Sequence, residues 1–75
     1  MEFQIQLNSI DEVVNFVGMM EQYEWPADAK YGSIVLDARS FMGLISLGLG
    51  RKIQIQVHGE KNESFAESMA VFKAS

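Results

Sequence analysis

Polar and apolar residues alternate along three stretches of this chain. In the first stretch, apolar Phe3, Ile5 and Leu7 are separated by polar residues. Successive side chains of a strand point to opposite faces of a sheet, so this period of two predicts strands with one buried face. We expect these strands over residues 2–7, 33–38 and 53–58.

A fourth strand is expected over residues 27–30. It is separated from residues 33–38 by Tyr31-Gly32, and two extended stretches joined by a short turn with glycine are typical of a hairpin. Trp25-Pro26 stands before this hairpin and ends whatever helix precedes it, because proline disfavours helical geometry in the residue before it.

The first helix is expected from residue 10 to about residue 22, where apolar residues recur at helical spacing. Ser9 and Glu12 match a capping box, in which the Ser9 hydroxyl accepts from the Glu12 amide and the Glu12 carboxylate reaches back to the Ser9 amide. The stripe that should be buried consists of Ile10, Val13, Val14, Val17 and Met20 or Glu21.

Two shorter helices are expected later in the chain. Ser40 is suited to cap a helix over residues 41–47, and Gly48 is suited to end it, because glycine readily adopts the left-handed conformation that closes helices. A last helix should open at Lys61 or Asn62, followed by apolar residues at helical spacing, namely Phe65, Met69 and Phe72.

These elements follow one another in the order strand, helix, strand, strand, helix, strand, helix. Every strand is apolar on one face, which requires one antiparallel sheet covered by helices on one side. The predicted fold is therefore a single α+β domain over residues 1–75, an open-faced β-sandwich of four antiparallel strands with three helices on one face.

Composition narrows the function classes. The chain of 75 residues has no cysteine and carries a net charge of −4, and its basic residues form no cluster beyond Arg51-Lys52, so nucleic acid is not an expected ligand. No apolar run reaches the roughly 18 residues of a membrane span, and the alternating N-terminus does not resemble a signal peptide, so the expected location is the cytoplasm. The sequence contains no nucleophile paired with a base and no set of metal ligands. We therefore expect a protein that is not an enzyme and that needs no cofactor. His58, at the end of a strand, is interpreted as a solvated residue.

Residues 38–48 read Ala-Arg-Ser-Phe-Met-Gly-Leu-Ile-Ser-Leu-Gly. This segment closely resembles the regulatory-serine segment of HPr, the small phosphocarrier of the bacterial sugar phosphotransferase system, whose usual pattern is K-S-[IL]-[ML]-G-[VIL]-[ML]-S-L-G. The resemblance extends over the whole chain and is most specific over residues 37–50. It implies the same βαββαβα fold.

The phosphoryl-carrying histidine of HPr lies in a pattern close to G-[IL]-H-A-R-P-A. In this alignment Asp11 stands where HPr has that histidine, and Val13 and Val14 replace the following arginine and proline. The only histidine of the chain is His58. We therefore expect that the histidine phosphocarrier function is absent. Asp11 is interpreted either as a carboxylate that complements the positive end of the helix dipole or as a partial mimic of the phosphorylated state.

In the HPr family the serine aligned with Ser40 is the target of a dedicated kinase. The resemblance thus implies that Ser40 is a regulatory phosphorylation site and that Phe41, Met42 and Ile45 contact protein partners. Exposed Met and aromatic side chains suit such adaptable surfaces. The alternatives are that Ser40 is an ordinary N-cap and that the apolar residues pack under neighbouring loops.

The preferred hypothesis is an HPr-like regulatory or protein-interaction module, comparable to catabolite-repression HPr, which also lacks the active histidine. Its partners would be HPr kinase, a transcriptional regulator or other sugar-system proteins. The rival hypotheses are a phosphocarrier that uses another acceptor and a plain structural or binding domain. The oligomeric state is not predicted.

Overall fold

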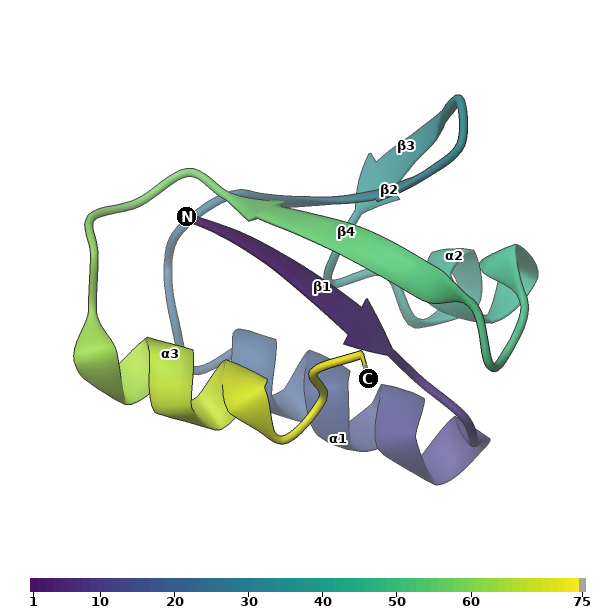
Figure 1. Cartoon of the computed structure of the whole chain (residues 1–75), viewed down its shortest axis with the longest axis horizontal. Helices are drawn as coiled ribbons and strands as arrows, with labels where there is room; N and C mark the ends of the chain where they lie inside the picture. Colours follow the sequence, from purple (N-terminus) through teal and green to yellow (C-terminus); the bar gives the residue numbers. More distant parts are fainter. Residues whose placement is uncertain (75) are drawn as a thin grey trace.

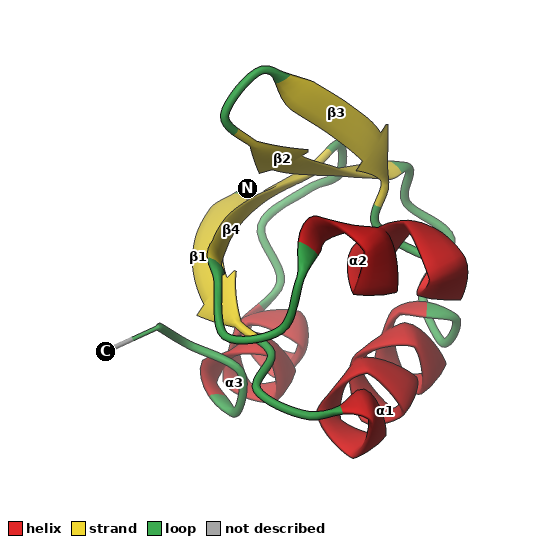
Figure 2. Ribbon diagram, turned by 90° about the vertical axis from the view of Figure 1, so that its right-hand side faces the viewer, coloured by secondary structure: helices red, strands yellow, loops and turns green. Residues whose placement is uncertain are grey.

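The structure is a computed structural model that describes residues 1–74. Four antiparallel strands form one sheet in the order β1-β4-β2-β3, and three helices lie together on one side of it (Figure 1, Figure 2). The predicted open-faced sandwich is confirmed. In chain order the elements are β1 (Glu2–Gln6), α1 (Ile10–Met20), β2 (Ala27–Tyr31), β3 (Ile34–Asp37), α2 (Phe41–Leu47), β4 (Lys52–Val57) and α3 (Glu63–Ala70).

Alternation along the strands sets the two faces of the sheet. In β4, Ile53, Ile55 and Val57 are buried beneath the helices, whereas Gln54 is exposed on the open face. Residues directly opposite each other in neighbouring strands share a face, and the register pairs Phe3 with Ile55. The apolar face of the sheet and the buried sides of the helices therefore form one core.

The hairpin between β2 and β3 turns one residue later than predicted. Tyr31 is the last residue of β2, and the two-residue turn is Gly32-Ser33. Gly32 has a φ of 60°, a conformation that costs glycine little and that two-residue hairpin turns require. The prediction was correct for Gly32, which lies in the turn, and wrong for Tyr31, which belongs to β2.

Helix α1 differs from its prediction in two respects. It ends at Met20 instead of about residue 22, and its buried residues include Phe16, which the predicted stripe left out. Ile10 and Val14, which were expected to be buried, are 55% and 51% exposed. The predicted stripe is therefore wrong on one side: it includes the β-branched residues Ile10 and Val14, which face solvent, and omits Phe16, which faces the core.

Helix α3 begins where predicted, with the Asn62 side chain accepting a hydrogen bond from the Phe65 amide at 2.9 Å. Phe72 is buried as expected, yet it lies beyond the helix end at Ala70. Its ring packs edge-on against Phe16 of α1, with centroids 5.3 Å apart. This contact joins α1 to the segment that follows α3.

An aromatic cluster closes the other end of the core. The rings of Tyr23 and Trp25 stack with centroids 5.4 Å apart, and both meet Phe65 of α3 edge-on. Trp25 also lies directly over the backbone of Gly59, where an added Cβ would be 2.4 Å from the Trp25 Cγ atom. The loop after α1 and the loop after β4 are thus packed together through one indole ring.

Candidate functional site

Ser40 is the N-cap of α2. Its backbone is extended, and its hydroxyl oxygen accepts a hydrogen bond from the Gly43 amide at 3.1 Å. A Cβ at Gly43 would lie 2.9 Å from the Ser40 Oγ atom and 3.2 Å from a methyl carbon of Leu36, so glycine lets the first turn of α2 pack closely against β3. The predicted cap is confirmed; the phosphorylation of Ser40 stays a prediction.

The three apolar residues of the predicted partner surface are exposed to different extents. Met42 is 73% exposed, whereas Phe41 and Ile45 are half-buried and pack against the core. Leu44 and Leu47, on the inner side of the helix, are buried. At 100° per residue, Phe41 and Ile45 lie on the flank of α2 opposite Gly43, which faces β3.

The first turn of α1 carries two carboxylates. Asp11 is exposed, and the Glu12 amide donates to the Ser9 hydroxyl at 3.2 Å. The Glu12 carboxylate accepts a hydrogen bond from the Asn8 amide, not from the Ser9 amide that the capping box predicted. The carboxylate therefore reaches one residue further back than expected and ties down the loop that enters the helix.

Helices α1 and α2 pack side by side, and a hydrogen bond at each end of the pair shows that they run in opposite directions. At one end of the pair, the Arg39 guanidinium before α2 donates to the Tyr23 carbonyl after α1, at 2.7 Å. At the other end, the Gly50 amide after α2 donates to the Leu7 carbonyl before α1, also at 2.7 Å.

Asp11 and Ser40 consequently lie at opposite ends of this pair, although each belongs to the first turn of its own helix. The 11 residues of α1 are about 16 Å long, which exceeds the Debye length of about 8 Å at physiological salt. A charge at Asp11 and a charge at Ser40 would therefore act on different parts of a bound partner.

Ile10 and Val14 extend the apolar surface onto α1. Figure 2 shows α2 and α3 on different sides of α1. Phe16 contacts Phe72, which follows α3, and helical geometry therefore places Ile10 and Val14 on the other flank of α1, toward α2. Both are about half exposed. The sequence analysis predicted that Ile10 and Val14 are buried. Their position next to Asp11 and Glu12 in the first turn was the feature of the sequence that could have indicated exposure.

His58 lies on the open face of the sheet, away from α1 and α2. Its Nε2 atom is 2.9 Å from the Asp28 carboxylate, and the two side chains are 49% and 41% exposed. The prediction that His58 is exposed at the end of a strand is confirmed, but its pairing with Asp28 was not predicted. Asp28 is on β2, so the pairing depends on which strand lies beside β4.

Within residues 1–74, no group of three or more His, Cys, Asp or Glu side chains is arranged to hold a metal ion. In the same part of the chain, no helix is both long and apolar enough to cross a membrane.

Two solved structures are similar to this chain over nearly its whole length. One is HPr-C-His from Thermoanaerobacter tengcongensis, with a TM-score of 0.75, 18% identity, and coverage of 95% of this chain and 88% of that one. The chain has the HPr fold. The other is the phosphocarrier protein HPr from Bacillus anthracis str. Ames, with a TM-score of 0.72, 21% identity, and coverage of 99% and 96%. No family model matches the sequence, and no curated protein matches it either.

Proposed function

We propose that this chain is an HPr-like regulatory or protein-interaction module of the bacterial sugar phosphotransferase system, located in the cytoplasm and controlled through phosphorylation of Ser40. The HPr fold supports the assignment to this system. The observation that carries the regulatory part is local: the Ser40 hydroxyl caps α2 immediately before Phe41 and the exposed Met42.

Phosphorylation of Ser40 would change the surface without refolding the domain. A phosphoryl group adds about −1.5 to −2 charges, and at a helix N-terminus these charges meet free amides and the positive end of the helix dipole. The same charges would stand next to apolar Phe41 and Met42. A partner that docks on these side chains would then lose affinity, whereas a partner with an arginine at that point would gain it.

The docking surface in this proposal comprises Phe41, Met42 and Ile45 of α2 together with Ile10 and Val14 of α1. Each of these residues is exposed or half-buried. Two helices with apolar flanks turned toward each other form a shallow surface suited to a protein partner. HPr kinase, a transcriptional regulator or another sugar-system protein is the partner class that we propose.

The first turn of α1 supports a module that is not a histidine phosphocarrier, and no catalytic activity of its own is proposed. Residues 8–14 contain no histidine, and the exposed Asp11 occupies the aligned position. A phosphorylated carrier holds its phosphate at such a helix start, next to a counter-charge. Here Asp11 and Glu12 make the same place negative, and we propose that they act as helix-start carboxylates.

The kinase test uses a cap-preserving variant. The full chain is incubated with an HPr kinase and ATP and then weighed by mass spectrometry; we expect one added phosphoryl group on the wild type and none on Ser40→Asn. Asparagine keeps an N-cap acceptor but has no hydroxyl, so α2 stays capped. Ser46→Ala is the matched control, because Ser46 is on the same helix, and it should be modified like the wild type. No mass increase, or an increase that persists in Ser40→Asn, contradicts the proposal.

A second test addresses the rival hypotheses. The chain is incubated with enzyme I and phosphoenolpyruvate, and any phosphorylation is mapped; we expect none. Labelling within residues 8–14 or at His58 would establish a phosphocarrier with another acceptor. Kinase inertness, together with a pull-down that contains no sugar-system protein, would favour a plain binding domain.

The role of Asp11 is tested separately by comparing partner binding of the wild type and Asp11→Asn. Equal affinities would rule out a carboxylate that mimics the phosphorylated state.

A further inference from the structure

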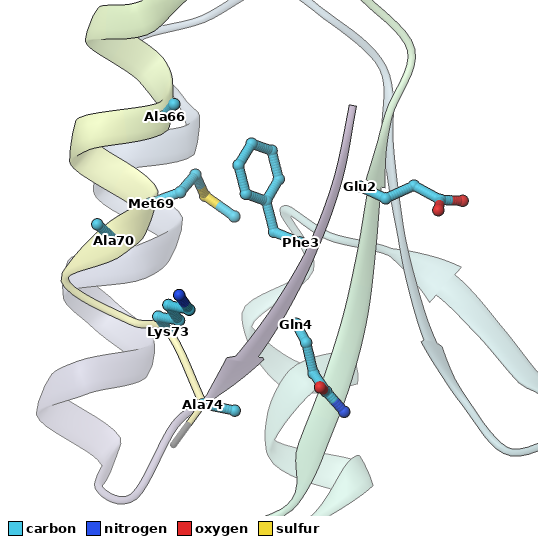
Figure 3. Close-up of a pocket in the computed structure, with 8 residues that line it drawn as sticks. All are labelled: Glu2, Phe3, Gln4, Ala66, Met69, Ala70, Lys73 and Ala74. Atoms are coloured by element: carbon cyan, nitrogen blue, oxygen red, sulfur yellow. The ribbon is translucent and has the colours of Figure 1, made fainter.

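β3 forms one edge of the sheet, and its outer side has no strand beside it among residues 1–74. The edge at β1 differs, because residues 72–74 run along it and the Ala74 amide donates to the Gln4 carbonyl. Figure 3 shows Lys73 and Ala74 beside β1. β3 is three strands away from this segment, and the residues before and after β3 are all described.

The outer side of β3 presents backbone groups of Val35 and Asp37. The Ala38 amide donates to the Ala27 carbonyl of β2 at 3.0 Å, and in an antiparallel pair the groups of every second residue point to the same side. The N–H and C=O of Val35 and Asp37 therefore face away from β2. The Asp37 carbonyl accepts a hydrogen bond from the Ser40 amide, so both groups of Val35 and the Asp37 amide are left for a further strand.

β3 lacks the features that usually protect an edge strand. Its first three residues are apolar Ile34, Val35 and Leu36, and its register with β2 contains no bulge. Ile34 is 50% exposed and Val35 is 59% exposed. Natural proteins commonly place lysine, proline or a bulge on an open edge, because its backbone groups are a template for another strand. An apolar edge without them favours strand addition.

We propose that β3 pairs with β3 of a second copy of this chain, antiparallel and about a two-fold axis through Val35. The two Val35 residues exchange two backbone hydrogen bonds, and the Asp37 amide of each copy donates to the Ser33 carbonyl of the other. That carbonyl belongs to the same planar peptide as the Ile34 amide, which faces β2, so it points outward. The two sheets join into one, with the helices of both copies on the same face.

Apolar side chains meet across this register. Val35 lies on the open face of the sheet, in one row with Lys30 and Gln54, and faces Val35 of the second copy. Ile34 and Leu36 lie on the helix face, and each faces the other residue of this pair in the second copy. The exposed apolar side chains of β3 therefore all gain an apolar neighbour.

Charge also selects this register. Asp37 lies opposite Ser33 of the second copy, whose hydroxyl can donate to the carboxylate. An axis through Asp37 would instead place two carboxylates directly opposite each other, which is destabilising. The neighbouring registers either leave Asp37 outside the pairing or place it opposite Val35. The edge is thus complementary to itself about one axis, which is why we assign a second copy as the occupant.

The interface is small. About five residues of each copy take part, compared with the roughly 20–30 of a standard interface, so we expect a weak dimer that forms toward about 1 mM. The net charge of −4 on each copy opposes association, and salt screens it. The measurements are therefore made in 0.5 M NaCl.

Sedimentation equilibrium and NMR on the full ¹⁵N-labelled chain, from about 0.02 to 1 mM, test the proposal. We expect the mass to rise toward that of a dimer and the amide resonances of Val35 and Asp37 to shift with concentration. A mixture of ¹³C-labelled and unlabelled chain should give a filtered NOE between the α-protons of Ile34 and Leu36. The reason is that opposed residues of a non-hydrogen-bonded pair have Cα atoms about 4.5 Å apart.

Two variants at Val35 test the centre of the interface. Val35→Pro removes an outward N–H, and an edge strand tolerates proline on that side, so the fold should persist while the dimer is lost. Val35→Lys places like charges opposite each other and should weaken the dimer at least tenfold. Met42→Lys is the matched control: it changes the net charge equally at an exposed apolar residue of α2 and should dimerise like the wild type. Circular dichroism checks that each variant is folded.

Substitutions in the turn test the register. Ser33→Lys places an ammonium opposite Asp37 and should tighten the dimer at least threefold, whereas Ser33→Glu places a carboxylate there and should weaken it at least threefold. Ser64→Lys and Ser64→Glu make the same changes in net charge at an exposed position of α3. Each should alter the dissociation constant less than twofold.

Three results would overturn the proposal: a chain that stays monomeric at 1 mM, a dimer that persists in folded Val35→Lys, or concentration-dependent shifts confined to α1 and α2. The last result would show that the copies meet through the helices. A monomeric chain whose Val35 amide shifts only when an alternating lysine–valine peptide is added would assign the edge to a different protein. The experiment uses the unphosphorylated chain alone, so none of these results bears on the kinase experiment.

Discussion

Gly59→Ala should destabilise the domain because the Trp25 ring occupies the place of the new methyl group. The added Cβ would be 2.4, 2.5 and 2.6 Å from three atoms of the indole, whereas ordinary contacts begin near 3.4 Å, so the ring must move by about 1 Å. The φ of Gly59 is outside the left-handed region, so alanine introduces no backbone strain. The effect therefore comes from packing alone.

The magnitude follows from what the ring contacts. Moving it disturbs the stack on Tyr23 and the edge contact with Phe65, and each such aromatic pair contributes about 0.5–1.5 kcal/mol. Overpacking of this kind costs about 1–3 kcal/mol. We expect a loss of about 2 kcal/mol, which for a domain of this size lowers Tm by roughly 8–16 °C.

Urea unfolding followed by circular dichroism measures this loss, and a double-mutant cycle with Trp25→Ala identifies its cause. When the indole is absent, Gly59→Ala should cost a few tenths of a kcal/mol, because the space around Gly59 is then empty. The reasoning is refuted if Gly59→Ala costs less than about 0.5 kcal/mol in the wild type, or if its cost is the same with and without Trp25.

Three further predictions concern the two helices of the proposed surface. Ser40→Ala should lower the free energy of unfolding by about 1 kcal/mol, and Ser40→Asn by much less, when both are measured by urea unfolding. Leu44→Ala should cost about 2–5 kcal/mol in the same assay, because Leu44 is 1% exposed; a value near zero would contradict its place in the core. Met42→Lys should leave stability within about 0.5 kcal/mol of the wild type, since Met42 is exposed, while calorimetric titration should show weaker binding of a partner that docks on α2; unchanged binding would exclude Met42 from the interface.

Local patterns predicted which elements form and where the three helices begin. Ser9, Ser40 and Asn62 each accept a hydrogen bond from an amide three residues later, as side chains of these types do at helix starts. The strand periods predicted the buried face of β1 and β4 correctly. These features depend on neighbours close in the chain, which the sequence displays directly.

Faces of helices were harder to predict. Ile10 and Val14 are exposed although they are apolar, and Phe16 is buried where the stripe omitted it. A helix with apolar residues around most of its circumference fits several stripes equally well. Which stripe is buried depends on the position of α2 and α3 beside it, and that information is not local.

From the sequence alone it was possible to determine the order of elements, the open-faced sandwich, the cap at Ser40 and the presence of two carboxylates and no histidine within residues 8–14. Only the tertiary structure decided that Asp11 and Ser40 lie at opposite ends of a helix pair, and that Asp28 lies beside His58. The physical reason is the range of the interactions. Periodicity and capping act over a few residues, whereas the relative direction of helices and the neighbours of a strand are set when distant segments pack against one another.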